Sequence, residues 1–244
     1  MHFVIDIGNT RTKAGLFERG ELMASATWEG LPTAHITTWA YNHPITAALF
    51  SSSGDAAAAL EAALREWGAP PVRLHHGLRL PFDNRYATPE TLGRDRIAGV
   101  AGAAALHPGR HCLVIDAGTC ITLDVLTADG VYPGGNISPG VRMRLRAMHA
   151  QTARLPLVAP GPPDDLLGVS TETALRNGGV LGAILEIEAF IERCTARYPD
   201  PIVLLTGGDA PLLAPHLKTK IFALPNLVLY GLQEILRLNV EMES

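Results

Sequence analysis

The residues best suited to do chemistry form a glycine turn near the start of the chain, Asp6-Ile7-Gly8-Asn9-Thr10-Arg11-Thr12-Lys13. Apolar residues on both sides indicate two strands joined by a tight turn, whose glycine would permit a positive φ and close approach of an anion. Thr10, Thr12 and Lys13 add hydrogen-bond donors. Asp6 is suited to hold a hydrated Mg²⁺ on the β- and γ-phosphates of a nucleotide. The turn predicts a phosphate cradle, but an Asx-turn hairpin without a ligand explains the same residues and stays open.

A second turn of the same kind, Asp116-Ala117-Gly118-Thr119, follows another run of β-branched residues. If the two turns converge on one triphosphate, the two carboxylates need cations between them. Asp116 is therefore a candidate ligand for a second, monovalent cation, and Thr119 is a candidate hydrogen-bond donor to the phosphate chain. Asp124, in the returning strand, is either a support for that ligand or a cross-strand partner.

A third candidate block, Gly93-Arg94-Asp95-Arg96, follows Tyr86 and introduces a predicted helix over 97–106. Asp95 at a helix start is ordinarily an N-cap, but a carboxylate held there could also accept the proton of an attacking hydroxyl. Arg96 would bind a substrate carboxylate, and Tyr86 would form part of the pocket wall. Such a pocket suits a small acid that carries a primary alcohol.

The elements that must position these residues form two similar halves. The segments 3–10 and 113–119 are each a buried strand ending in an Asp-x-Gly turn, and a second strand returns over 14–17 or 121–126. No linker rich in Gly and Ser separates the halves, so we expect a hinge near 108–110 between packed domains. Further predicted strands are 22–28, 45–50, 131–134 and 202–206; predicted helices are 33–41, 55–67, 172–197, one starting near Asn226, and one with Ser138 as N-cap and Pro139 at its first position.

Composition narrows the class of protein. Of the 244 residues 47% are hydrophobic and 18% charged, and the formal net charge of -4 gives no basic excess for binding nucleic acid or an anionic membrane. We expect no nucleic-acid partner, no membrane span and, because no signal-peptide pattern is present, a cytoplasmic location. Cys112, Cys120 and Cys194 have no CxxC spacing, which argues against a disulfide framework and a thiolate zinc site.

The duplicated strand-turn-strand pattern resembles the actin-like ATPases and sugar kinases. That resemblance implies an α/β fold of two ribonuclease-H-like domains, each a mixed sheet flanked by helices, with a nucleotide cleft between them. The expected domains are residues 1–109 and 110–244.

The order and spacing of the motifs closely resemble type III pantothenate kinases. Tyr86 is followed seven residues later by Gly-x-Asp-Arg, and an Asp-x-Gly turn stands on either side of that block. Further segments match the family in order: Pro133-Gly134-Gly135-Asn136-Ile137-Ser138-Pro139-Gly140, Gly168-Val169-Ser170-Thr171 and Thr206-Gly207-Gly208-Asp209. The Gly207-Gly208 turn resembles the superfamily's adenosine-side loop, and a plain strand-to-helix turn explains it equally.

The family resemblance implies a role for each matching residue. Asp95 would be the general base, Asp116 would bind potassium or ammonium, and Thr171 would reach pantothenate across the interface of a homodimer, so that two chains build each active site. The implied ATP-binding residues are Asp6, Ile7, Gly8, Asn9, Thr10, Arg11, Thr12, Lys13 and Thr119, and the implied substrate-binding residues are Tyr86, Gly93, Arg94, Asp95, Arg96 and Thr171. Two residues depart from the family pattern, Arg94 and Cys120, and neither removes a contact group.

The expected function is transfer of the ATP γ-phosphate, with Mg²⁺ and a monovalent cation, to the primary hydroxyl of pantothenate, giving 4'-phosphopantothenate in the first step of coenzyme A biosynthesis. Another kinase or a phosphohydrolase on the same fold would share the phosphate turns but not the block around Tyr86 and residues 93–96. A regulatory or accessory protein with weak catalysis is the alternative from a different class. The absence of a basic stripe weighs against direct DNA contact.

Overall fold

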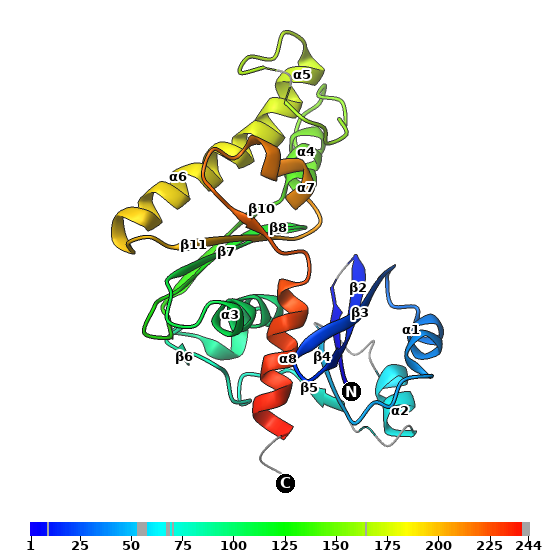
Figure 1. The fold of residues 1–244 in the computed structure, drawn as a ribbon. Coiled ribbons are helices and arrows are strands. Elements are labelled where there is room, and N and C mark those ends of the chain that lie inside the picture. Colours follow the sequence, from blue (N-terminus) through cyan, green and yellow to red (C-terminus); the bar gives the residue numbers. More distant parts are fainter. Residues whose placement is uncertain (9, 53–57, 67–68, 70, 164, 241–244) are drawn as a thin grey trace. The chain divides into compact units, whose positions relative to one another are not determined.

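The structure is a computed structural model that describes residues 1–8, 10–52, 58–66, 69, 71–163 and 165–240 (Figure 1). It divides the chain into two compact units. Unit 1 contains residues 1–108, residues 130–132 and the C-terminal segment that starts at Asn226. Unit 2 contains residues 109–129 and 133–225. The chain therefore enters unit 1 three times, whereas the sequence predicts one continuous segment for each domain.

The sheet of unit 1 has the strand order β3-β2-β1-β4-β5. Its strands are β1 (His2–Ile7), β2 (Arg11–Glu18), β3 (Glu21–Glu29), β4 (Ala47–Ser52) and β5 (Pro71–Arg73). The hairpin of β1, β2 and β3 is antiparallel, whereas β4 and β5 run parallel to β1. The run Phe3-Val4-Ile5 is buried throughout because β1 lies in the middle of the sheet, whereas burial alternates along β3 at the edge.

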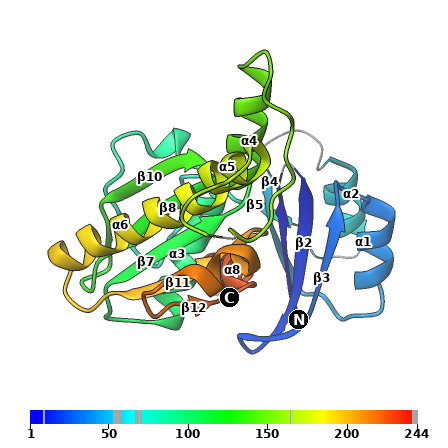
Figure 2. The same ribbon diagram turned by 90° about the horizontal axis from the view of Figure 1, so that it is seen from above.

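Helices cover both faces of this sheet. On one face α1 (Thr33–Ala40) and α2 (Ala58–Glu66) bury Ile36, Leu60 and Leu64 against Phe3 and Ile5 (Figures 1 and 2). On the other face lies α8 (Leu227–Val240), which packs on α3 (Arg94–Leu106) and on the sheet. The ends of the predicted helix over 55–67 fall partly outside the described residues.

Glycine brings α3 and α8 into close contact. A Cβ on Gly231 would overlap the carbonyl oxygen of Ala98, and one on Gly102 would overlap that of Leu227. The two helix backbones therefore touch, and this crossing places the C-terminal helix in unit 1. Its predicted apolar face is buried there, through Leu229, Leu232, Ile235 and Leu236.

A two-stranded sheet in unit 1 corrects one sequence prediction. The segment 131–134 was expected to be the third strand of the second half. Only Val131–Tyr132 form a strand, β9, and it runs parallel to β6 (Asp83–Asn84). A positive φ of 132° at Gly134 separates β9 from β10 (Gly134–Pro139), which pairs with β8 (Cys120–Leu126) instead.

The sheet of unit 2, in the order β10-β8-β7-β11-β12, repeats the strand arrangement of unit 1. Its remaining strands are β7 (Cys112–Ala117), β11 (Ile202–Thr206) and β12 (Phe222–Ala223). As in unit 1, three antiparallel strands are followed by two parallel ones. This repeat confirms the two similar halves expected from the sequence.

Helices of unit 2 bury one face of its sheet. The core joins Leu113 and Ile115 of β7 to Val141 of α4 (Val141–Ala150) and to Ile184 and Ile187 of α6 (Gly182–Arg197). The predicted helix over 172–197 is α5 (Thr171–Arg176), a π-helical turn (Asn177–Leu181) and α6 in succession. Unit 2 also has α7 (Ala210–Leu213) and the 3₁₀ turn Ala214–His216, and unit 1 has the 3₁₀ turn Pro89–Thr91.

The start of α4 differs from the prediction. Ser138 and Pro139 lie in β10, and Gly140 is the N-cap of α4. Strand pairing of Ser138 with Ile121 and of Pro139 with Cys120 holds both residues in extended backbone. Among the described residues, no helix is long and apolar enough to cross a membrane.

Candidate active site

In unit 1, the first turn joins β1 to β2 and is closed by a hydrogen bond from Gly8 N–H to the carbonyl oxygen of Arg11 (3.0 Å). The strands hold Asp6 directly opposite Lys13. Thr10 and Arg11 are exposed, and Asn9 lies outside the described residues. A positive φ was expected at Gly8, but Gly8 is not among the glycines that have one, so the turn closes without a left-handed residue at this position.

Two residues of the predicted phosphate turn point inward. Thr12 is fully buried, and its hydroxyl donates to the carbonyl oxygen of Gly30 (2.5 Å). The prediction of a Thr12 hydroxyl facing phosphate is therefore wrong, since strand alternation turns this side chain away from the exposed Arg11. Ile7 packs in the core of the sheet, so only its backbone could face a ligand.

Asp6 lies in an acidic surrounding. Burial, and after it the negative charge of Asp95, raises the pKa of Asp6 from 3.8 to about 6, while a hydrogen bond from Ser51 and the charge of Lys13 act in the opposite direction. Two carboxylates that repel each other beside a phosphate-type turn are a donor set that a divalent cation would stabilise. The described residues hold no cluster of three or more acidic, His or Cys ligands, so a metal here would also need phosphate oxygens or water as ligands.

The start of α3 holds the candidate base. Gly93 is the N-cap and Arg94 begins the helix, so Asp95 is the second helical residue and not the N-cap. Its Oδ1 accepts the backbone N–H of Arg96 (2.9 Å), and a Cβ on Gly93 would lie 2.5 Å from that oxygen. The hydrogen bond from Arg96 orients the carboxylate of Asp95 within the first turn of α3. Because Asp95 is exposed, this carboxylate remains accessible.

Arg96 lies in an aromatic box in unit 1. Its side chain is 5% exposed, and its guanidinium lies 5.4 Å from the centre of the Tyr86 ring. Nη2 of Arg96 donates to the hydroxyl of Tyr132 (2.9 Å). The structure therefore brings together the predicted pair Tyr86 and Arg96, and it adds Tyr132, which the sequence analysis did not single out.

In unit 2, Asp116 lies near the end of β7, and Thr119 lies in the second turn, between β7 and β8. Thr119 is exposed, and Asp116 pairs with Thr206 across β7 and β11. Gly207 has a φ of 97°, and a Cβ there would overlap the carbonyl oxygen of Ala117 and Oδ1 of Asp116. Gly207 therefore lies directly against the carboxylate proposed to hold a cation.

Glycines and backbone hydrogen bonds fix this second turn from two directions. The N–H of Gly140 donates to the carbonyl oxygen of Thr119 (3.1 Å), and that of Asp209 donates to Ala117 (2.8 Å). Motifs near 140 and 207 that the sequence analysis noted separately thus meet at one turn. Asp124 is 1% exposed and lies opposite Gly135 of β10, where a Cβ would overlap its Oδ1, so its environment is that of a cross-strand partner.

Thr171 lies elsewhere in unit 2, as the first residue of α5. Ser170 is the N-cap, and a capping box joins it to Thr173: the N–H of Thr173 donates to Ser170 Oγ (3.2 Å) and the N–H of Ser170 to Thr173 Oγ1 (2.9 Å). Thr171 is exposed.

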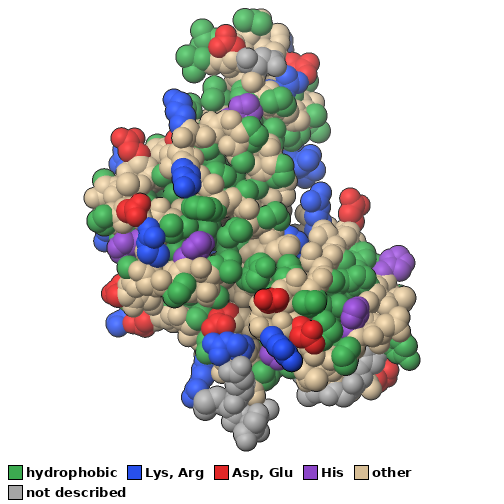
Figure 3. Space-filling view, in the orientation of Figure 1, with side chains coloured by type: hydrophobic (Ala, Val, Ile, Leu, Met, Phe, Trp, Pro, Cys, Tyr) green, Lys and Arg blue, Asp and Glu red, His purple; other side chains and the backbone are tan. Residues whose placement is uncertain are grey.

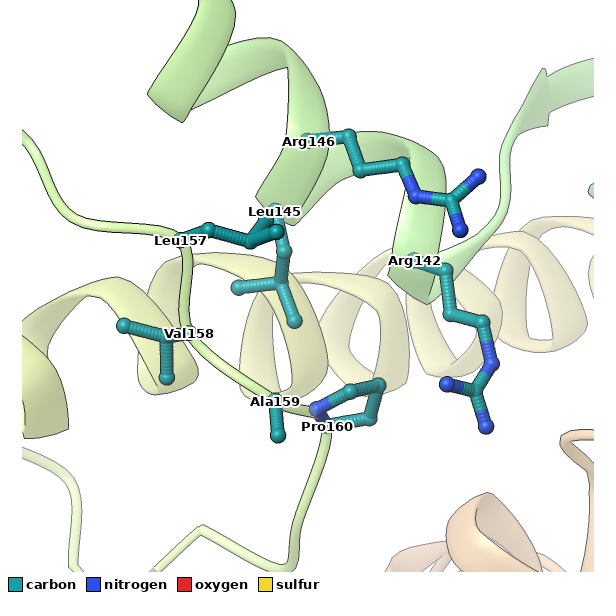
Figure 4. A pocket seen from close by; sticks show the side chains of 7 residues that line it. All are labelled: Arg142, Leu145, Arg146, Leu157, Val158, Ala159 and Pro160. Carbon is teal, nitrogen blue, oxygen red and sulfur yellow. The ribbon is translucent and has the colours of Figure 1, made fainter.

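A cavity of about 250 Å³ in unit 2 is a separate feature (Figure 4). The guanidinium groups of Arg142 and Arg146 lie at one side of it, and Val158 and Pro160 belong to the opposite wall. Its lining residues are Arg142, Leu145, Arg146, Leu157, Val158, Ala159 and Pro160, and none of them is a predicted site residue.

Comparison with known proteins decides the family. The family model described as "Type III pantothenate kinase" matches residues 2–193. This chain belongs to the type III pantothenate kinase family. A type III pantothenate kinase of Christiangramia forsetii is 40% identical over 98% of this chain and 99% of its own length. One of Bacteroides fragilis is 41% identical over 98% of each chain. The family expected from the motifs is confirmed.

Solved structures place this type III pantothenate kinase chain in the expected fold class. A protein of Campylobacter jejuni described as a "putative Baf family transcriptional activator" has a TM-score of 0.62 at 21% identity, covering 96% of this chain and 97% of its own. A protein of Listeria monocytogenes described as "a putative N-acetylmannosamine kinase" has a TM-score of 0.54 at 14% identity and covers 100% and 99%. MreB5 of Spiroplasma citri bound to ADP has a TM-score of 0.51 at 10% identity and covers 100% and 98%. At these identities the likeness concerns the fold alone.

Two residues of this family member's site were missed by sequence reasoning. Ser51, at the end of β4, hydrogen-bonds Asp6, and Tyr132 contacts Arg96. Ser51 lies in a Ser-rich run that carries no motif. Tyr132 stands directly before the Pro133-Gly134-Gly135 motif, and that position was the available signal.

Proposed function

We propose that this chain is an ATP-dependent pantothenate kinase that transfers the γ-phosphate of ATP to the primary hydroxyl of pantothenate, giving 4'-phosphopantothenate and ADP. This is the first step of coenzyme A biosynthesis. The observation that carries the proposal is the pairing of Asp6 with Asp95 in unit 1, where the charge of Asp95 contributes to the raised pKa of Asp6. The proposed phosphate turn and the candidate base would therefore belong to one site. The name of the full-length relatives supports the substrate.

The nucleotide part of the proposal rests on the first turn. Backbone groups of residues 6–11 and the side chains of Thr10, Arg11 and Lys13 would bind ATP phosphates. Asp6 would hold Mg²⁺ through water, and the bound ion would neutralise charge on the β- and γ-phosphates. This use of Asp6 also explains its position, because a nearby cation offsets the repulsion between Asp6 and Asp95.

The acceptor part of the proposal rests on the start of α3. Asp95 would accept the proton of the attacking hydroxyl, since its carboxylate is exposed and oriented by the N–H of Arg96. Arg96 and Tyr86 would bind the pantothenate carboxylate, because a buried guanidinium is a strong partner for a planar anion. Gly93 and Arg94 would line the same pocket. Most of the rate gain would come from positioning and charge neutralisation.

For unit 2 we propose that Asp116 binds potassium or ammonium and that Thr119 contacts ATP. The carboxylate of Asp116 lies against the glycine turn at Gly207, and Thr119 is exposed beside it. Oxygen ligands suit such a cation, and the carboxylate of Asp116 would supply one.

The proposed active form is a homodimer in which Thr171 of one chain reaches the pantothenate site of the other. Exposed apolar residues beside Thr171 support an interface: Leu166, Leu167 and Val169 are 70%, 75% and 95% exposed. Figure 3 shows hydrophobic side chains at the end of unit 2 that carries α5. We expect Val169→Asp to lower the mass in sedimentation equilibrium and to abolish activity, whereas Met23→Asp, at a 55% exposed position of β3, leaves both unchanged.

The proposed location is the cytoplasm, where ATP is available and free cysteines such as Cys112 and Cys194 stay reduced.

The experiment that tests the function is a coupled ADP-release assay with ATP and Mg²⁺. Pantothenate is compared with glucose, glycerol, acetate and no acceptor, with potassium or sodium as the monovalent cation. We expect turnover with pantothenate alone and stimulation by potassium. Absence of pantothenate turnover with every cation would overturn the proposal and favour a regulatory role.

A further inference from the structure

The feature that carries a further inference is the buried environment of Arg96. A guanidinium removed from water needs partners that satisfy its N–H groups and fix its direction. Two such partners are Tyr86, whose ring lies 5.4 Å from the guanidinium carbon, and Tyr132, whose hydroxyl accepts from Nη2 at 2.9 Å. The hydrogen bond to Tyr132 is buried and joins residues 36 positions apart in the chain.

Tyr132 is itself held firmly. Its side chain is 1% exposed, and its ring packs on Phe82 (centroids 5.8 Å apart, 64° between planes) and stacks on Tyr86 (6.1 Å, 23°). The aromatic rings and the hydroxyl therefore confine the guanidinium of Arg96 from two sides. A side chain locked in this way loses little further freedom when it binds a ligand.

The backbone around Tyr132 places the ring there. β9 pairs with β6, with Asn84 opposite Tyr132, and the N–H of Arg85 donates to the carbonyl oxygen of Tyr132 (3.0 Å). The N–H of Tyr86 donates to the side chain of Asn84 (3.0 Å), so the same small sheet also orients Tyr86. Residues 130–132 belong to unit 1 although the segments before and after them belong to unit 2.

We propose that Tyr132 is a positioning residue that orients the guanidinium of Arg96 toward the carboxylate of the acceptor. The inference rests on the proposed function, because it assumes that Arg96 binds pantothenate. Tyr132 acts through Arg96: its hydroxyl accepts one N–H of the guanidinium, and its ring stacks on Tyr86, so the direction of the guanidinium is fixed before the acceptor binds. Neither the nucleotide turn nor Asp95 is required for this role.

The test is Tyr132→Phe, which removes the hydroxyl and keeps the ring packing. We expect KM for pantothenate to rise about tenfold, the effect of losing one hydrogen bond to a charged group. The values of kcat and of KM for ATP should stay within about twofold of wild type, since the reacting groups are untouched. Tyr230→Phe is the matched control. Tyr230 packs edge-on against Phe17 in the same unit, with ring centres 5.5 Å apart, and is not one of the two tyrosines described around Arg96.

A second measurement separates positioning from general damage. Pantothenol carries the same primary hydroxyl but a hydroxymethyl group in place of the carboxylate, so its inhibition constant against pantothenate should not change in Tyr132→Phe. The preference of the enzyme for the carboxylate would thus fall about tenfold. Thermal unfolding of each variant shows whether it is folded.

The outcomes are distinct. A folded Tyr132→Phe with unchanged KM for pantothenate overturns the inference, and so does an equal loss for pantothenate, pantothenol and ATP. If wild-type protein does not phosphorylate pantothenate, the proposed function itself fails and the role of Tyr132 fails with it.

Discussion

The two Asp-x-Gly turns of the molecule occupy equivalent positions in their sheets but have different surroundings. Each joins the central strand of a five-stranded sheet to its antiparallel neighbour, and the two sheets share one strand order. In unit 1 the carboxylate of Asp6 hydrogen-bonds the Ser51 hydroxyl and is affected by the negative charge of Asp95. In unit 2 the carboxylate of Asp116 meets the glycine backbone at Gly207 and lies in a turn whose carbonyls are tied to neighbouring loops.

The difference would give the two hairpins distinct chemical roles in the proposed function. Burial, and after it the negative charge of Asp95, raises the pKa of Asp6, so a nearby cation would favour its charged form. Asp116 has a close-packed backbone surrounding that suits a cation held by oxygen dipoles.

The largest effect concerns the second carboxylate of unit 1. Asp95→Asn should lower kcat by about 10²–10⁴-fold, the usual contribution of a general base. ATP affinity should change little, since Asn can still accept the N–H of Arg96. Steady-state kinetics and nucleotide titration measure both. Asp83→Asn, which removes an exposed partner of Arg85, is the control; near-full turnover in Asp95→Asn would end the base assignment.

The next effect concerns the turn of unit 2. Gly207→Ala should weaken potassium stimulation about ten- to hundredfold, because its Cβ overlaps Asp116 Oδ1 and its φ of 97° strains any other residue. Gly109→Ala carries a similar strain at a φ of 71° but meets no atom within 4 Å, so it should retain stimulation. The rate is measured against potassium concentration. An unchanged potassium response in folded Gly207→Ala would remove Asp116 from the cation site.

The pH dependence of stability tests the repulsion around Asp6. Its folded pKa of about 6 exceeds the unfolded value near 3.8, so the folded state binds a proton more tightly. Stability from this group therefore falls as pH rises from about 4 to 6, and the full penalty remains above 6. The shift corresponds to about 3 kcal/mol, which partial exposure to water reduces to about 1–2 kcal/mol.

Asp6→Asn should therefore stabilise the protein without ligands at pH 8 by about 1–2 kcal/mol and give a smaller gain at pH 5. Urea unfolding at the two pH values measures the difference. Ser51→Ala should act in the opposite direction at pH 8, because it removes a hydrogen bond that favours the charged carboxylate. An Asp6→Asn effect independent of pH would show that the charge of buried Asp6 does not control stability.

The smallest effect separates two threonines of the first turn. Thr10→Val should raise KM for ATP, because Thr10 is exposed beside the proposed phosphate site. Thr12→Val should leave KM for ATP unchanged and lower the free energy of unfolding by about 1 kcal/mol, because the carbonyl of Gly30 loses its donor. Kinetics and urea unfolding of both variants check the pair; a raised KM in Thr12→Val would contradict the inward orientation.

Much of the fold could be predicted because its signals are local. Runs of apolar residues mark β1, β4, β7 and β11, and the Asp-x-Gly turns follow from neighbouring residue types. The start of α4 was predicted two residues early, since capping propensity at Ser138 is outweighed by strand pairing with β8. The return of α8 to unit 1 depends on a glycine contact between distant helices, which no local pattern reveals.

Motif order and residue type are properties of the chain, so they were enough to predict the family and the residues suited to catalysis. Which of these residues meet depends on the fold. It turned the Thr12 hydroxyl toward Gly30 and set Ser51 beside Asp6. It also carried Tyr132 to Arg96 on a short strand between two segments of unit 2. Such contacts arise from pairing between distant strands and from buried polar groups seeking partners, so they are fixed by the packed chain as a whole.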